Sequence, residues 1–178
     1  MLAAHSFIKV AAVTDHDSVR GCKATLQLAS AYPDILIIPG VEITTENGYG
    51  DIVVLGTDEL PPRPWTPEVV ADFARSVDGV SIVAHPFRMY GMGEKARNYK
   101  VDAIEVLNGG SNSQANAQAK EFAKSLNLPG TAGSDAHSVS ELFAVNNRVE
   151  ASLDVDSILK AVKRGAVLAQ RTVNSLHI

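Results

Sequence analysis

The stretch GTAGSDAH, residues 130–137, places a run of small residues directly before two potential metal ligands, Asp135 and His137. It follows the turn-like segment LNLPG, so the run reads as a short buried strand. Residues two apart in an extended segment point to the same side, and both side chains can therefore face one cavity. Two donors do not complete a metal site, so the rest of the chain must supply partners for them.

Six further apolar runs resemble this stretch, and helical patterns separate them. The runs are VAAVT (10–14), ILII (35–38), IVVL (52–55), VSIVA (80–84), AIEVL (103–107) and AVNNRV (144–149). Several are nearly continuous in apolar residues, as expected for strands that are covered on both faces. The alternation predicts an α/β fold with a mainly parallel sheet. In such folds ligand sites gather at the carboxyl ends of the strands.

Helix and turn signals fill the intervals between the runs. The predicted helix starts are Asp17 or Ser18 for residues 18–31, Thr66 before Pro67, a Ser111–Gln114 capping box for a helix to about Leu126, and Asp154 for a helix ending before Gly165. The segment TTENGYGD (44–51) predicts a hairpin turn between two extended runs.

Composition narrows the class of protein. With 178 residues, 46% of them hydrophobic and 20% charged, the chain is expected to form one soluble globular domain over residues 1–178. A net charge of −4 without a basic patch argues against an extended nucleic-acid groove, while a small anionic substrate is allowed. No run has the length of a membrane span, and no secretory signal is evident. The single cysteine, Cys22, cannot form an internal disulfide, so we expect a cytoplasmic protein.

Acids and imidazoles follow four of the predicted strands, each where its strand ends. They are Asp15 and His16 after the first run, Glu42 after the second, His85 after VSIVA, and Asp135 with His137 after GTAGS. Strand ends share one rim in a parallel sheet, so these side chains are expected to meet. Histidine and carboxylate ligands without cysteine suit Zn, Mn or Fe. We expect His16 to be a ligand and Asp15 to orient a ligand imidazole.

Each of these residues also has an ordinary structural explanation. The DHD triplet alone resembles a turn with a helix cap, Glu42 could pair with an arginine, and His85 could be a core histidine. Their common position at strand ends is what favours a metal site. Glu105 and Asn108 also lie at a strand end. They could line the same cavity or pack in the core, and the sequence favours neither explanation.

Four short motifs occur in order along the chain. They are AAVTDHDSVRG, IIPGVEITT, IVAHPFR and GSDAH, and KAVKRGAV follows them near the end. Together they resemble the PHP family, the polymerase and histidinol phosphatase domain of metal-dependent phosphoesterases. The resemblance runs from about residue 8 to about residue 171. It implies a distorted (β/α)7 barrel with its site at the C-terminal ends of the strands.

The resemblance also implies a cluster of up to three metal ions and hydrolysis of a phosphoester by a metal-activated water. In the family pattern Glu42 would bridge two ions, with His85 on one and Asp135 on the other. His16 and His137 would belong to the third ion.

The implied substrate is a small phosphorylated molecule, with nucleotides among the candidates. Arg88, which follows the motif residues HPF, would contact a substrate phosphate, or it is a surface arginine.

Part of the family pattern has no counterpart in this sequence. The opening His-x-His strand and the Ser-Asp-Gly turn are missing, since MLAAHSFIKV resembles the helix that follows them, and Val53 stands where many members have a histidine. We expect an N-terminally incomplete barrel without its first strand and at most about one or two metal ions. His5 and His177 lie outside the pattern and are interpreted as surface or packing residues.

Three explanations of the missing motif stay open. The first explanation is that the given sequence starts late. The second is that the protein is a degenerate binding or structural module without catalytic activity. The third explanation is that another chain completes the exposed sheet edge in a homo-oligomer.

Overall fold

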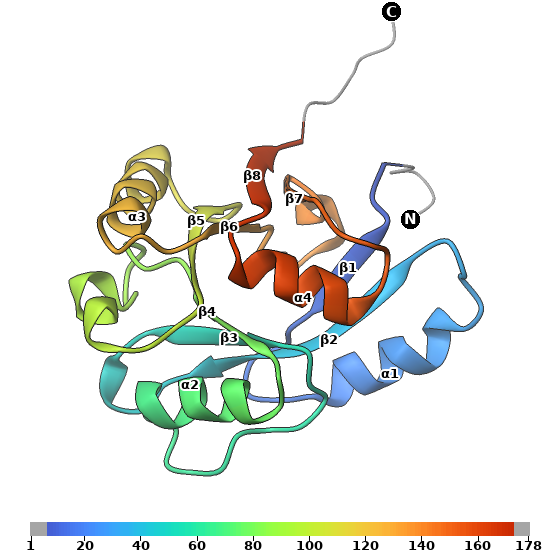
Figure 1. Ribbon diagram of the computed structural model, residues 1–178, viewed down its shortest axis with the longest axis horizontal. Helices are drawn as coiled ribbons and strands as arrows, with labels where there is room; N and C mark the ends of the chain where they lie inside the picture. The colour runs from blue at the N-terminus through green and yellow to red at the C-terminus, as the bar shows by residue number, and fades with distance from the viewer. Residues whose placement is uncertain (1–6, 173–178) are drawn as a thin grey trace, which may run out of the picture.

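The fold, described for residues 7–172 of a computed structural model, is built around a curled six-stranded sheet (Figure 1). Its strands lie side by side in chain order: β1 (Val10–Val13), β2 (Leu36–Thr44), β3 (Asp51–Leu55), β4 (Val80–Val83), β5 (Ala103–Asn108) and β6 (Gly130–Gly133). The pairs β1–β2, β4–β5 and β5–β6 are parallel, whereas β3 is antiparallel to both of its neighbours. The protein therefore has a mixed α/β fold with a half-barrel sheet, and β3 is the exception to the predicted parallel order.

The hairpin predicted over residues 44–51 joins β2 to β3. Thr44 pairs with Asp51, and the backbone N–H of Thr45 donates to the carbonyl of Gly50 at 3.0 Å. The turn includes the short 3-10 helix η2 (Glu46–Gly48). Gly50 has a φ of +86°, and a Cβ atom there would lie 2.5 Å from the backbone nitrogen of Met92. Only glycine fits this position without a shift of the backbone.

A second, two-stranded sheet pairs β7 (Val145–Val149) with β8 (Val167–Arg171) in antiparallel fashion. It joins the main sheet through a side chain, because the Asn147 amide accepts from the N–H of Ala132 at 2.8 Å and donates to its carbonyl at 2.7 Å. Asn147 thus satisfies backbone groups of β6. The strand β8 was not predicted, since it forms only by pairing with β7 across an intervening helix.

Within residues 7–172, the helices that connect the strands are α1 (Arg20–Ala29), α2 (Pro67–Ser76), α3 (Ser113–Ser125) and α4 (Val155–Lys163). The short 3-10 helices η3 (Gly93–Asn98) and η4 (Val139–Glu141) lie in the loops after β4 and β6. As predicted, the side chains of Thr66 and Asp154 cap α2 and α4, accepting from the N–H groups of Val69 and Ser157.

Two of the predicted capping side chains were wrong. Asn112, one residue beyond Ser111, caps α3 by accepting from the N–H of Ala115 at 2.8 Å. Asp17 does not cap α1, because its carboxylate accepts instead from the N–H of Thr44 at 2.8 Å. Ser18, the other candidate for α1, accepts through its hydroxyl from the N–H of Arg20, the first residue of the helix, at 3.3 Å. In both cases a competing hydrogen-bond partner decided the role of the side chain.

The two faces of the main sheet are covered by different helices. Val70, Ala71 and Ala74 of α2 pack into a core cluster with Val41 and other residues of one face. Ile158, Leu159 and Val162 of α4 pack against the opposite face, with Ile38, Val80 and Ile82. Figure 1 shows α4 lying across the sheet on a different side from α2. Alternation along β2 puts Glu42 on the same face as Ile38, so α4 covers the face that carries Glu42.

Replacement of Leu159 tests the packing of α4. Leu159 is 5% exposed and lies in the cluster beneath α4, so Leu159→Ala should lower the free energy of unfolding by about 2–5 kcal/mol. Urea unfolding followed by circular dichroism measures this change. The matched control is Leu153→Ala, because Leu153 is 63% exposed; its effect should stay within about 0.5 kcal/mol. Equal effects of the two substitutions would contradict this packing.

Candidate metal centre

Three potential metal donors converge from adjacent strands at one edge of the sheet. Glu42 of β2, Asp51 of β3 and His85 after β4 each offer a ligand atom, and these atoms all lie within 4.8 Å of one another. His85 Nε2 lies 3.1 Å from Glu42 Oε1 and 3.8 Å from Asp51 Oδ2. The side chains of Glu42 and His85 are each 10% exposed. We call Glu42, Asp51 and His85 the three-donor cluster.

Strand direction brings the three donors together. Strands β2 and β4 run toward this edge and β3 runs away from it, so Asp51, the first residue of β3, lies beside the last residues of its neighbours. Glu42 lies inside β2, which continues to Thr44, and not beyond the strand end as predicted. The chain leaves β4 at His85, whose φ of 28° lies in the left-handed region.

Sequence reasoning missed Asp51 because it searched only the residues that follow strands. The hairpin register was the available signal. Once Thr44 is paired with Asp51, the alternation of side chains places Asp51 on the face of Glu42.

The electrostatics of the cluster favour a bound cation. Burial raises the pKa of Asp51, and the charge of Glu42 raises it further. Burial of the His85 ring opposes its charge, but the hydrogen bond to Glu42 and the nearby carboxylates outweigh burial and raise the pKa of His85. Two crowded carboxylates beside one imidazole form an oxygen and nitrogen donor set that suits borderline divalent ions. The three residues therefore fit a divalent metal by their chemistry.

His16 and His137 lie at the exposed rim of the site. His16 forms an isolated parallel bridge with Glu42, and its Nε2 lies 3.7 Å from Glu42 Oε2. The His16 and His137 rings have centroids 6.2 Å apart. Their side chains are 46% and 69% exposed, respectively. The structure thus brings both predicted imidazoles to one rim, with His16 beside the three-donor cluster.

Asp135 belongs to a second group of polar side chains. It follows β6 with a φ of 51°, and its side chain is 8% exposed. Its Oδ2 accepts from Arg88 Nη1 and, at 3.3 Å, from Asn108 Nδ2. His137 Nδ1 lies 3.5 Å from Asp135 Oδ1. The predicted phosphate contact Arg88 is therefore paired with the predicted ligand Asp135.

The remaining sequence candidates lie elsewhere. The Asp15 carboxylate lies over α1, where a Cβ atom on Gly21 would come within 2.2 Å of Asp15 Oδ2. Within residues 7–172 it makes no hydrogen bond to an imidazole, so its predicted orienting role has no support in the geometry. Val53 pairs with Glu42 and packs in the cluster under α4. His5 and His177 lie outside the described residues.

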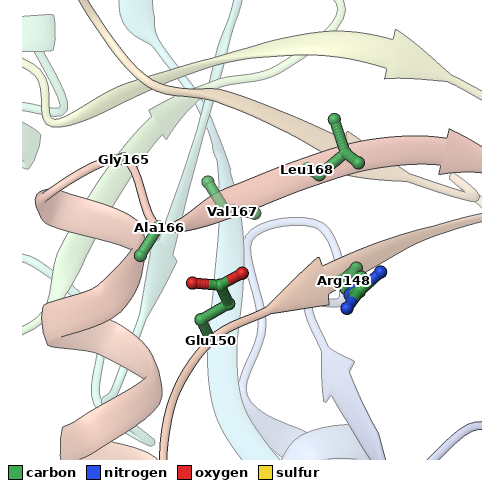
Figure 2. A pocket seen from close by; sticks show the side chains of 6 residues that line it. All are labelled: Arg148, Glu150, Gly165, Ala166, Val167 and Leu168. Atoms are coloured by element: carbon green, nitrogen blue, oxygen red, sulfur yellow. The ribbon is translucent and has the colours of Figure 1, made fainter.

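A hollow of about 320 Å³ lies on the small sheet, away from these residues (Figure 2). Figure 2 shows Arg148 and Glu150 on one side of it and residues 165–168 on the other. None of the candidate site residues lines this hollow. One arginine, one glutamate and a few apolar side chains do not make it a chemical site.

Comparison with known proteins agrees with this fold. Residues 113–167 match the family model described as PHP-associated. Over 92% of its length the chain is similar to a crystal structure from Bacteroides vulgatus, a two-domain protein containing a predicted PHP-like metal-dependent phosphoesterase, with a TM-score of 0.74 and 16% identity. An amidohydrolase from Chromobacterium violaceum, with bound sulfate and no metal, aligns over 97% of this chain and 91% of its own, with a TM-score of 0.65 and 16% identity.

A curated relative is the uncharacterized protein MJ1587 of Methanocaldococcus jannaschii, 29% identical over 103 residues, which are 57% of this chain. These matches agree with the resemblance of the ordered motifs to PHP proteins, because the family model covers residues 113–167 and the solved structures share the fold of this chain.

The chain spans a little over half the length of two of these relatives. The match spans 58% of the curated relative and 56% of the Bacteroides chain.

Within residues 7–172, no helix is long and apolar enough to cross a membrane.

Replacement of Asp51 tests the three-donor cluster. Asp51→Asn removes a charged metal donor, so it should weaken Mn²⁺ binding at least about tenfold. Loss of a residue that only holds a metal ligand in place already costs about tenfold in affinity. Isothermal titration calorimetry on chelator-treated protein measures the affinity. Asp34→Asn, the same change at an exposed residue outside the site, should bind Mn²⁺ like the wild type. Unchanged binding by Asp51→Asn would remove Asp51 from the site.

Proposed function

We propose that the protein is a metal-dependent phosphoesterase that hydrolyses a small phosphorylated substrate. The observation that carries this proposal is the three-donor cluster, whose ligand atoms lie within 4.8 Å of one another at the strand edge. In the reaction a water oxygen forms a bond to phosphorus and the ester P–O bond breaks. The leaving oxygen takes up the proton that the attacking water gives up, so the products are an alcohol and a phosphate. When bound, a divalent ion supplies the activated water and neutralises charge on the phosphoryl oxygens.

The residues of this chain take distinct roles in the proposal. Glu42, Asp51 and His85 hold Zn, Mn or Fe, and the nearby His16 extends the donor set at the exposed rim. Asp135 and His137 would form a second donor pair only when Asp135 is released from Arg88, because a guanidinium and a cation compete for the same carboxylate. We therefore propose that the site holds fewer ions than the three that the family resemblance implies.

We also propose that the six-stranded sheet is part of a PHP-type barrel.

Arg88 supports the proposed substrate class. Its side chain is 43% exposed and lies beside Asp135 at the rim of the site. A guanidinium recognises phosphate oxygens by paired hydrogen bonds, and one exposed arginine suits a small substrate better than a long nucleic acid. The sulfate bound in the Chromobacterium structure is a tetrahedral oxyanion of the same shape as phosphate. Nucleotides remain one candidate among small phosphorylated molecules.

The central experiment is an assay of chelator-treated protein with Zn²⁺, Mn²⁺ or Fe²⁺ added back. p-Nitrophenyl phosphate reports monoesterase activity, and bis(p-nitrophenyl) phosphate reports diesterase activity. The metal-restored rate should fall in His85→Ala to the rate of the metal-free protein, because the change removes the only nitrogen donor of the three-donor cluster. Asp34→Asn should keep the wild-type rate. Absence of metal-dependent turnover with either substrate would refute the enzymatic proposal.

A second prediction concerns Arg88. Loss of a hydrogen bond to a charged group costs roughly 1.5–3 kcal/mol, so Arg88→Ala should raise KM about tenfold or more. Arg88→Lys keeps the charge but loses the paired geometry, and it should recover only part of the affinity. Steady-state kinetics on the better of the two nitrophenyl esters measures KM. An unchanged KM in Arg88→Ala would make Arg88 a partner of Asp135 alone.

The alternative function is a binding or structural module without turnover. The Arg88–Asp135 ion pair favours it specifically, since that pair neutralises one predicted ligand. Metal binding without hydrolysis of either ester is the result that would select this alternative.

A further inference from the structure

Two buried polar residues of β5 lie between the two groups of site residues. Glu105 and Asn108 are 9% and 1% exposed, respectively. Neither belongs to the three-donor cluster. Their hydrogen bonds lead in opposite directions, one toward His85 after β4 and the other toward Asp135 after β6.

Glu105 holds the backbone of His85. Its Oε2 accepts from the N–H of His85 at 2.7 Å, at the point where His85 adopts its left-handed φ of 28°. A histidine in this region needs local support, since the conformation is unfavourable for residues other than glycine. The ring gives no such support through Nδ1, which is buried and has no hydrogen-bond partner within residues 7–172. The orientation of the ring therefore depends on Glu42 and on the backbone that Glu105 fixes.

The carboxylate of Glu105 packs closely against β6. A Cβ atom on Gly133 of β6 would lie 2.2 Å from Glu105 Oε1, so the carboxylate fills the space beside this glycine. Burial raises the pKa of Glu105 to about 7. A buried carboxyl group is costly for folding, and an apolar residue of similar size would pack at lower cost. The presence of an acid at this buried position, where it holds the backbone of His85, points to a role beyond packing.

Asn108 continues the connection to Asp135. Its Nδ2 donates to Glu105 Oε2 at 3.1 Å and to Asp135 Oδ2 at 3.3 Å. Its Oδ1 accepts from the N–H of Gly110 at 2.9 Å and from Ser111 Oγ at 3.0 Å. These two donors fix which end of the amide faces the carboxylates. One amide nitrogen thus joins both acids.

We propose that Glu105 and Asn108 are positioning residues, which hold His85 and Asp135 in register across β5 so that both sides of the site face one ligand. The inference rests on the proposed metal-dependent function. Neither residue is assigned contact with the metal or the substrate. Their effect passes through the backbone of His85 and the carboxylate of Asp135.

Co²⁺ titration of the chelator-treated protein tests the proposal, because its visible absorption reports both affinity and the geometry of the ligands. Glu105→Gln keeps a carbonyl acceptor for the two N–H donors, so it should bind Co²⁺ with nearly the wild-type affinity and spectrum. Glu105→Leu removes the acceptor and should weaken binding at least about tenfold with a changed spectrum. Asn108→Asp keeps the size and the Oδ1 acceptor but removes the donor, and it should weaken binding in the same way.

The control uses a similar polar connection at the other end of the same strands. Ser81 of β4 is 0% exposed, and its N–H and Oγ both donate to Asp102 Oδ2 at 2.8 Å. Ser81→Ala should lower the urea midpoint while leaving the Co²⁺ affinity and spectrum unchanged. If Glu105→Leu does not fold, the comparison of Asn108→Asp with Ser81→Ala decides the question.

The possible results separate this proposal from the proposed function. Wild-type Co²⁺ affinity in both Glu105→Leu and Asn108→Asp overturns the positioning role, as does an equal loss in Ser81→Ala. Co²⁺ binding with the expected variant series, but without ester hydrolysis, leaves the positioning role standing and overturns catalysis. A wild-type chain that binds no Co²⁺ overturns both.

Discussion

The hydrogen bond between the His85 ring and the Glu42 carboxylate joins two strands that are not neighbours, because β3 lies between β2 and β4. The two side chains span β3 on one face of the sheet and meet at 3.1 Å. Glu42 and His85 are each only 10% exposed, so their charges interact more strongly than they would in water. The chemistry of the site therefore depends on side chains that reach across β3.

The antiparallel strand β3 decides what else reaches this edge. A parallel strand in its place would bring its last residue to the site, whereas β3 brings its first residue, Asp51. The tight turn at Gly50 makes this possible, since its backbone passes too close to Met92 for any side chain. The same face of the sheet continues into the apolar cluster under α4. One face thus carries packing at one end and polar chemistry at the other.

On the β4–β6 side of the site, hydrogen bonds hold the potential metal ligands in place. Asp135 is held by Arg88 and Asn108, and His85 is held by Glu105. Because β4, β5 and β6 run parallel, their carboxyl ends present these groups side by side.

Local sequence determined where strands and helices lie and which side chains gather at strand ends. Apolar runs marked the six strands of the main sheet, and Thr66 and Asp154 marked two helix starts, because these signals depend on neighbouring residues only. Tertiary structure alone decided that Asp51 joins Glu42 and His85 and that Arg88 pairs with Asp135. Both outcomes depend on strand direction, on strand register and on which side chains compete for a hydrogen bond. Residues that are distant in the chain set these features, so a local sequence pattern does not predict them.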